Sequence, residues 1–243
     1  MLKRVPTVKS TFTKLDFVEA MIHAWKESYD AYPNKKQISI IFAQWSIETG
    51  QGTYCWNNNI GNSKAADVAG QIIEYCALNG VWEIINGKRV ELKSENPGSW
   101  FRSFPTLDLG VEHHFNLLRN KRYTIAWAQV EAGSPSGFSK LLRQQGYYTA
   151  PEADYTRAVT AYSDAFMKVT LFEQALANVT AENFTDDHVE FEAPLDMPIV
   201  HSFVEFEPRE LGEVDDGPIQ QGMVGQLYNF LMMLLSFFMK KKP

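Results

Sequence analysis

The chain has 243 residues, of which 45% are hydrophobic and 13% aromatic, and its formal net charge is −6. This length and composition predict a globular protein with one full core and room for an appendage. The negative charge belongs to the C-terminal part, because residues 1–181 carry a net charge of +2 and residues 182–216 one of −11. The expected folded part is therefore near neutral and has no basic stripe, which argues against nucleic acid as a partner.

The N-terminus and the cysteines restrict the class of protein further. The first ten residues, MLKRVPTVKS, include basic residues but no apolar run behind them, so we expect no secretory signal peptide. Two cysteines, Cys55 and Cys76, are too few for a cysteine-rich zinc site. They could form one disulfide or remain two buried thiols, and the sequence is compatible with both.

Two helices are predicted within the first fifty residues, each with a capping box at its start. Thr13 followed by Asp16 begins the first, and Asn34 followed by Gln37 begins the second. Apolar residues recur at helical spacing along both, which predicts that each contributes to the core.

The second helix ends on a carboxylate, Glu48, directly before a loop rich in Gly and Asn. Helical spacing places Ile41, Gln44 and Trp45 on the same face as Glu48, so this side chain should turn inward. Burial would disfavour its charged form, as a general acid near neutral pH requires. A solvated Glu at a fraying helix end fits this stretch equally well. The loop is compatible with a site for a sugar or an amide through its asparagines, Asn57, Asn58, Asn59 and Asn62.

After this loop we expect a helix over residues 65–78, with Val68, Ile72 and Tyr75 facing inward. After this segment the hydrophobic residues recur at every second position, the spacing typical of a β-strand, instead of at helical spacing.

Residues 81–93 predict a β-hairpin whose turn is Asn86 and Gly87, because both turn residues must tolerate positive φ. A two-residue turn fixes the register and pairs Glu83 with Val90. Glu83 is then the one acid on a mostly apolar face. That position is costly unless the carboxyl lies in a cleft, is hydrogen-bonded or is protonated.

The second half of the chain is predicted to be helical up to about residue 181. His113 and His114 point in different directions on their helix and have no further His or Cys at ligand spacing, so we interpret them as structural and expect no metal. A helix over 123–132 and a short helix follow. Pro151 begins another, and its expected inward residues are Tyr155, Val159, Tyr162, Phe166 and Val169.

Four motifs, in order, resemble those of the glucosaminidase-type peptidoglycan hydrolases, glycoside hydrolase family 73 of the lysozyme-like superfamily. AQWSIETGQG followed by NNNIG is similar to AQxxxETGxG followed by NNxxG. VWEIINGKRV is similar to TxExxxGxxV, with Val81 in place of Thr. WFRSFPTLDLGVEHHFNLLRNKRY resembles FRxYxSxxxSxxDHxxxLxxxxRY, and GYYTAPEADYTRAV resembles GYATDPxYAxKV with one extra residue before Tyr155. The likeness covers residues 38–159.

The resemblance implies an α+β, mostly α, lysozyme-like domain with a small β-hairpin lobe. It implies hydrolysis of a β-1,4 glycosidic bond in peptidoglycan, with no cofactor. Glu48 would be the catalytic acid, Glu83 the second carboxylate, acting as general base or stabilising charge, and Tyr155 a catalytic tyrosine in the cleft. The expected substrate-binding residues are Tyr54, Trp56, Asn59 and Tyr147.

Two other functions fit the same sequence. A lytic transglycosylase on this fold would need the acid but no second carboxylate. A non-catalytic wall-binding or membrane-anchored structural module would need neither.

We therefore expect three parts: a lysozyme-like glucosaminidase domain over residues 1–181, an acidic linker interrupted by prolines over 182–222, and a hydrophobic tail helix over 223–243. The tail is at the short limit for spanning a bilayer and ends in three lysines. A short tail anchor, an interfacial helix and an oligomerising helix all fit, with a buried packing helix as the alternative.

The expected location follows from a conflict between activity and export. A wall hydrolase must reach the wall, yet no export signal is expected here. The sequence therefore predicts a phage-encoded, virion-associated enzyme, tethered through its tail to a membrane or another hydrophobic virion component.

Overall fold

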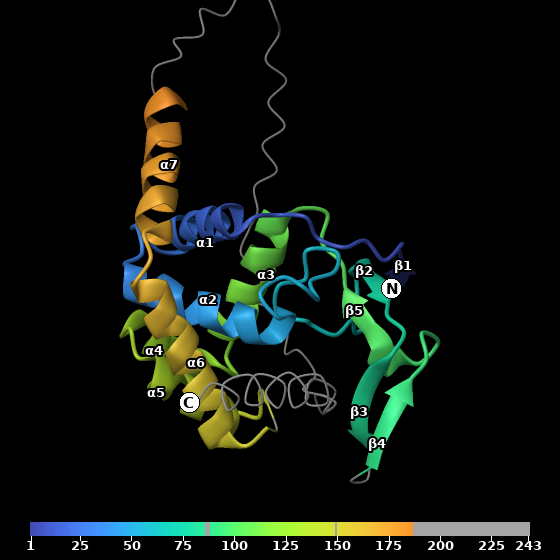
Figure 1. Ribbon diagram of the computed structural model, residues 1–243. Helices are drawn as coiled ribbons and strands as arrows, with labels where there is room; N and C mark the ends of the chain where they lie inside the picture. Colours follow the sequence, from blue (N-terminus) through green and yellow to red (C-terminus); the bar gives the residue numbers. More distant parts are fainter. Residues whose placement is uncertain (86–87, 149, 187–243) are drawn as a thin grey trace, which may run out of the picture.

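The computed structural model describes residues 1–85, 88–148 and 150–186 (Figure 1). It is mostly helical with small sheets, which confirms the predicted fold class. The helices and strands follow in the order β1 (Leu2–Arg4), α1 (Lys14–Tyr29), α2 (Lys35–Thr49), β2 (Ile73–Ala77), β3 (Val81–Ile85), β4 (Lys88–Leu92), a 3-10 helix (Pro97–Ser99), β5 (Trp100–Arg102), α3 (Leu107–Arg119), α4 (Thr124–Glu131), α5 (Pro135–Gln144), α6 (Glu152–Met167) and α7 (Leu171–Asp186).

Both predicted capping boxes are confirmed. The Thr13 hydroxyl accepts from the Asp16 backbone N–H at 3.1 Å, and the Asp16 carboxylate accepts from the Thr13 N–H at 2.7 Å. Asn34 and Gln37 make the same reciprocal pair at the start of α2. These bonds satisfy backbone donors that a helix start leaves without partners, so they fix where α1 and α2 begin.

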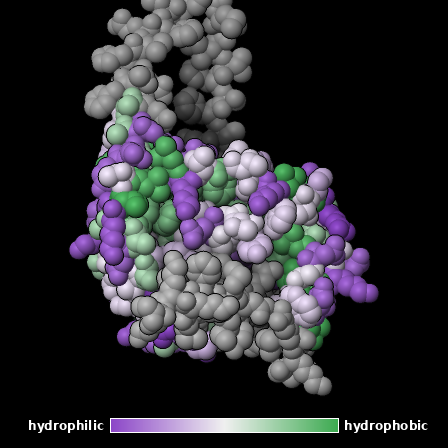
Figure 2. All heavy atoms as spheres, in the orientation of Figure 1, coloured by the Kyte–Doolittle hydropathy of each residue, from purple (hydrophilic) through white to green (hydrophobic). Residues whose placement is uncertain are grey.

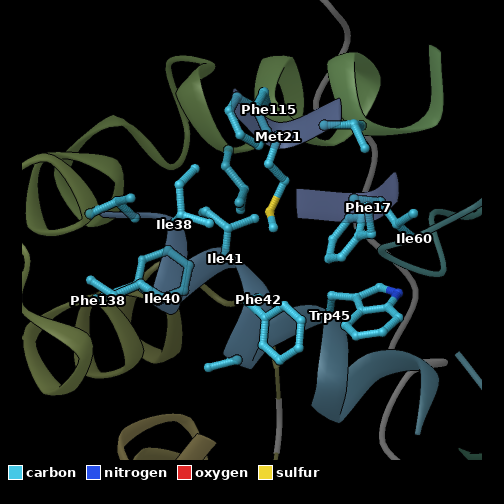
Figure 3. Packing of buried hydrophobic residues seen from close by; sticks show 14 of the residues in the cluster. Phe17, Met21, Ile38, Ile40, Ile41, Phe42, Trp45, Ile60, Phe115 and Phe138 are labelled. Atoms are coloured by element: carbon cyan, nitrogen blue, oxygen red, sulfur yellow. The ribbon is translucent and has the colours of Figure 1, made fainter. Parts of the chain in front are cut away.

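Helix α2 lies at the centre of the molecule. Every residue of its last three turns, from Ile38 to Thr49, is buried, polar residues such as Gln44 and Ser46 included. Figure 3 shows Ile41 and Trp45 packed with Phe17 and Met21 of α1. In Figure 1 helices α4, α5 and α6 gather at one side of α2, and the strands lie beyond its C-terminal end. Glu48, in the last turn of α2, therefore lies at the boundary between the helices and the strands.

The strands form two small sheets. One has the order β1-β2-β5, with β1 parallel and β5 antiparallel to β2, and the other is the hairpin β3-β4. The predicted hairpin register is confirmed, since Glu83 lies opposite Val90 and Val81 opposite Leu92. The turn residues 86–87 are outside the described residues. Buried Val81 and Leu92 join Cys76 and Phe101 in a second, smaller apolar cluster.

The predicted helix over residues 65–78 is wrong. Residues 65–72 hold no helix, and the next five form β2, the central strand of the three-stranded sheet. Ile72, expected inside, is 63% exposed, whereas Tyr75 is buried with its ring 4.7 Å from that of Trp100. Strand β1, about seventy residues earlier, supplies one hydrogen-bonding edge and β5 the other. Pairing with distant strands outweighs local helical spacing, because strand preference depends strongly on such neighbours.

The C-terminal helices correct one smaller prediction. Val169, expected on the inward stripe of α6, follows the end of that helix and is exposed. Helix α7 packs against α1, where the Asn178 amide donates to the Glu19 carboxylate at 2.6 Å, and it ends at Asp186. Residues 187–243, which include most of the expected linker and the whole expected tail helix, lie outside the described residues.

Three further observations concern the surface and the thiols. Cys55 and Cys76 are buried and free, so the disulfide alternative is not realised. On the face drawn in Figure 2, hydrophilic and hydrophobic residues are interspersed. Among the helices that the structure describes, none is both long enough and apolar enough to cross a bilayer.

Candidate active site

Glu48 occupies the last turn of α2, and its side chain is turned inward as predicted. The residue is 7% exposed. Burial raises the pKa of the Glu48 carboxyl from its ordinary value of 4.5 to about 8, and a hydrogen bond from Tyr155 opposes this effect. The charged form is disfavoured because water no longer solvates it. At neutral pH this carboxyl therefore carries a proton that it can donate.

Two tyrosines from the second half of the chain lie beside Glu48. The Tyr155 hydroxyl, from α6, donates a hydrogen bond to Glu48 Oε1 at 3.2 Å. Tyr147 is buried in the loop between α5 and α6, and its hydroxyl has no hydrogen-bond partner among the described residues. The pKa of each phenol is raised well above 10, first by burial and then by the neighbouring Glu48 charge. The structure thus brings together three of the predicted site residues, about a hundred positions apart in sequence.

The backbone after Glu48 makes three left-handed residues in a row. Gly50, Gln51 and Gly52 have φ values of 58°, 56° and 86°. Gly50 ends α2 in this conformation, which costs little where there is no Cβ. The chain therefore turns away from the helix at once, and the Glu48 carboxyl is not covered by a further helical turn.

The asparagines of the following loop have mainly a conformational role. Asn57, Asn58 and Asn62 all have positive φ, between 48° and 55°, a region that Asn tolerates better than most residues. The side-chain amide of Asn62 also donates to the backbone carbonyl of Glu48. The Asn-rich composition, which suggested a site for a sugar or an amide, is thus explained in large part by the turns of the loop.

Asn59, predicted to bind substrate, is 2% exposed. Its amide nitrogen donates to the carbonyl oxygens of Ser63 and Arg102, both at 2.9 Å, and its amide oxygen accepts from the Ser63 N–H at 2.8 Å. Both of its N–H groups are used within the protein. Asn59 thus ties the loop to β5, and its contact with substrate stays a prediction.

The remaining predicted site residues are placed less fully. Tyr54 is 53% exposed on the loop after α2, and Trp56 is partly buried against the small apolar cluster of the strands. Their contact with substrate stays a prediction. Glu83 lies on β3, but its side chain is outside the described part of the structure, so its distance from Glu48 and its role also stay predictions.

The two histidines lie in α3. His114 is buried, and its Nε2 is 3.1 Å from Oε1 of Gln44; burial lowers its pKa to about 3. His113 packs on the Phe104 ring, and burial lowers its pKa to about 4. Both are therefore neutral at pH 7, and the described residues hold no group of three His, Cys, Asp or Glu that could bind a metal.

Sequence reasoning missed Tyr148 as a neighbour of this site. Gln44, which helical spacing places on the face of Glu48, lies one helical turn before it and contacts His114. Tyr148 stacks on Tyr155 with 3.9 Å between the ring centroids. No local pattern indicates that contact, because it joins a loop to a helix.

Residues 23–168 match the family of mannosyl-glycoprotein endo-beta-N-acetylglucosaminidases, named Glucosaminidase. This match spans more than half of the chain and includes Glu48, Tyr147 and Tyr155. The chain belongs to the glucosaminidase family. It is thus a glycoside hydrolase, as the motifs predicted. No curated protein sequence matches the chain.

Several solved structures are similar in fold to this glucosaminidase. A peptidoglycan hydrolase mutant from Sphingomonas sp. A1 has a TM-score of 0.43 and 17% identity, over 68% of this chain and 99% of its own. The glycoside hydrolase domain of Salmonella typhimurium FlgJ has a TM-score of 0.41 and 17% identity, over 72% and 98%. The catalytic domain of the autolysin Auto from Listeria monocytogenes has a TM-score of 0.45 and 18% identity, over 68% and 89%.

Proposed function

We propose that this glucosaminidase hydrolyses β-1,4 glycosidic bonds of bacterial peptidoglycan and that Glu48 is its general acid. The observation that carries the proposal is the Glu48 carboxyl itself, which is buried, has a pKa raised to about 8 and contacts Tyr155. Cleavage of a glycosidic bond needs an acid that is protonated at working pH, because the leaving oxygen must be protonated as positive charge develops on the sugar ring. The motif resemblance supports peptidoglycan as the substrate class.

Tyr155 assists this step by stabilising the Glu48 carboxylate that is left after the proton has been transferred. Once Glu48 has given its proton to the leaving oxygen, a carboxylate remains in a site that burial makes unfavourable for charge. The Tyr155 hydroxyl donates to Oε1 of that group, and a hydrogen bond to a charged acceptor is worth more than one to a neutral acceptor. Tyr155 therefore lowers the energy of the ionised acid while burial keeps the resting acid protonated.

Glu83 is proposed as the second carboxylate, which activates a water or stabilises the developing charge. A lytic transglycosylase is the second candidate, because it would use the buried Glu48 acid but needs no second carboxylate to activate water.

The products released from purified sacculi decide between these reactions. We expect mass spectrometry to find muropeptides with a new reducing end, whose sugar identifies the bond that is cut, and Glu83→Gln to suppress their release. Anhydro sugars that persist in Glu83→Gln would establish a transglycosylase instead. Retention of the protein on sacculi with no release of products by the parent chain would indicate a wall-binding module.

We also propose that the enzyme is phage-encoded and associated with the virion, with its C-terminal segment attached to a membrane or another hydrophobic virion component. The support is compositional: residues 223–239 are predominantly apolar and are followed by three lysines, and the segment before them carries most of the negative charge. An apolar segment of this length with basic residues at its end is typical of membrane-binding tails.

Flotation with liposomes tests the attachment. The full chain is expected to float with the vesicles, whereas a truncation ending at Asp216 should stay at the bottom of the gradient. If both forms remain soluble and monodisperse without detergent and neither floats, the tail is an ordinary packing helix and the virion proposal loses its main support.

A further inference from the structure

The Tyr155 hydroxyl can serve Glu48 only if its ring is held in place, and the Tyr148 ring packs directly against it. The Tyr148 ring stacks on the Tyr155 ring, with 3.9 Å between centroids and 15° between planes. Tyr148 is 2% exposed. A near-parallel ring at this separation covers one face of Tyr155 and prevents it from tilting away from Glu48.

Tyr148 is itself fixed at its far end. Its hydroxyl donates to the carbonyl oxygen of Ser139 at 3.1 Å and lies 3.2 Å from the Ser139 hydroxyl. The Ser139 hydroxyl is buried in α5 and lies 2.8 Å from the hydroxyl of Thr156. Thr156 belongs to α6 and follows Tyr155 directly in the sequence. The Tyr148 ring is therefore anchored to the two helices between which it lies.

The backbone that carries Tyr148 is also held at both ends. The Arg143 guanidinium donates to the Tyr148 carbonyl at 2.7 Å, and the Arg122 Nε donates to the Gln145 carbonyl at 3.1 Å. The Tyr147 N–H donates to the Leu142 carbonyl at 2.9 Å. A loop that is bonded in this way holds its side chains in one arrangement, as a preorganised site requires.

We propose that Tyr148 is a positioning residue of the reaction, which acts through Tyr155 by holding its hydroxyl against the Glu48 carboxyl. The inference rests on the proposed function, since it concerns the same acid. In the family pattern GYATDPxYAxKV the matching position is Ala. The stacked Tyr148 ring is therefore a point at which this chain differs from the family pattern.

A double-mutant cycle in the full chain tests whether Tyr148 acts through Tyr155. Tyr155→Phe is expected to lower kcat about tenfold, the effect of losing one hydrogen bond to a charged group. Tyr148→Leu, which removes the stacked ring, should lower kcat by a similar factor with KM nearly unchanged. In the Tyr155→Phe background the same Tyr148→Leu change should lower kcat less than about twofold, because coupled residues are not additive.

The pH profile gives a second readout that loss of packing alone would not move. The alkaline limb of kcat/KM is expected near pH 8, where Glu48 loses its proton. Since the Tyr155 hydrogen bond lowers the pKa of Glu48, Tyr155→Phe and Tyr148→Leu should each move this limb to higher pH. The double variant should show no further movement.

Tyr75→Leu is the matched control, because Tyr75 is a buried tyrosine whose ring packs on Trp100 outside this site. It should lower thermal stability but leave kcat and the alkaline limb in place. If Tyr148→Leu does not fold, Tyr148→Met repeats the cycle with a flexible side chain that lacks a flat face.

Equal loss of kcat from Tyr148→Leu in both backgrounds, or an alkaline limb that stays in place or moves to lower pH, would overturn the positioning role. Failure of the proposed function itself looks different: the parent enzyme would release no sugar products, or Glu48→Gln would release as much as the parent.

Discussion

Glu48→Gln is expected to lower kcat for wall cleavage by about 10²- to 10⁴-fold, the usual contribution of a general acid. Glutamine has nearly the same shape as the protonated glutamic acid and can still accept the Tyr155 hydrogen bond that the structure shows. It cannot release a proton to the leaving oxygen. Release of soluble muropeptides from purified sacculi, measured over time for the parent and the variant, gives the ratio directly.

The stability of the same pair, followed against pH, separates a catalytic acid from a structural one. The folded state raises the pKa of Glu48 from 4.5 to about 8, so between these values the native chain holds a proton that the unfolded chain has lost. The contribution of Glu48 protonation to the free energy of unfolding is fully present below pH 4.5. This contribution falls as pH rises, by about 1.4 kcal/mol per pH unit, until pH 8.

Glutamine at position 48 does not titrate, so this loss should be missing from the variant. Glu48→Gln is therefore expected to be at least as stable as the parent at pH 8, with the difference shrinking towards pH 5. Thermal unfolding at several pH values measures it. A variant whose melting temperature falls as far as that of a core mutant at every pH would mean that Glu48 is structural.

The features that the sequence predicted well are those set by neighbours along the chain. The capping boxes at Thr13 and Asn34 join residues three positions apart, and the hairpin register follows from a two-residue turn. Glu48 belongs to the same class, because its inward direction follows from helical spacing to Trp45. For its role as the acid, the motif resemblance was also needed.

The features that could not be predicted depend on residues far apart. Strand β2 forms because β1 pairs with it across about seventy positions, and nothing within residues 65–78 indicates that partner. The contact of Tyr155 with Glu48 spans 107 positions; the motif resemblance assigned both residues to one cleft but did not indicate their hydrogen bond. Asn59 shows the converse: its residue type suggested ligand binding, whereas its burial and three internal bonds are visible only in the fold.

The loop that follows Glu48 depends on a close contact with α3 that only glycine allows. A Cβ at Gly110 would overlap the backbone carbonyl oxygen of Asn58 and lie 3.1 Å from its carbonyl carbon. That carbonyl has little freedom to move. The Asn58 N–H donates to the Ser10 hydroxyl at 2.8 Å, its amide donates to the Phe104 carbonyl at 3.1 Å, and its φ is already 55°.

Gly110→Ala is therefore expected to lower the free energy of unfolding by about 3 kcal/mol, the upper range for overpacking a closed contact. In a domain of this size the melting temperature should fall by about 10 °C. Helix propensity alone predicts the opposite sign, because Ala is favoured over Gly within a helix by about 1 kcal/mol. Gly137→Ala is the matched control, because the atoms nearest its Cβ belong to side chains and not to the backbone. The end of Gln129 can rotate away, and displacing the Ser134 hydroxyl costs at most its 3.3 Å N-cap bond with the Gly137 N–H, about 1 kcal/mol. Thermal unfolding should show a clearly larger loss for Gly110→Ala than for Gly137→Ala, and equal stabilities would mean that α3 can shift away from the loop at little cost.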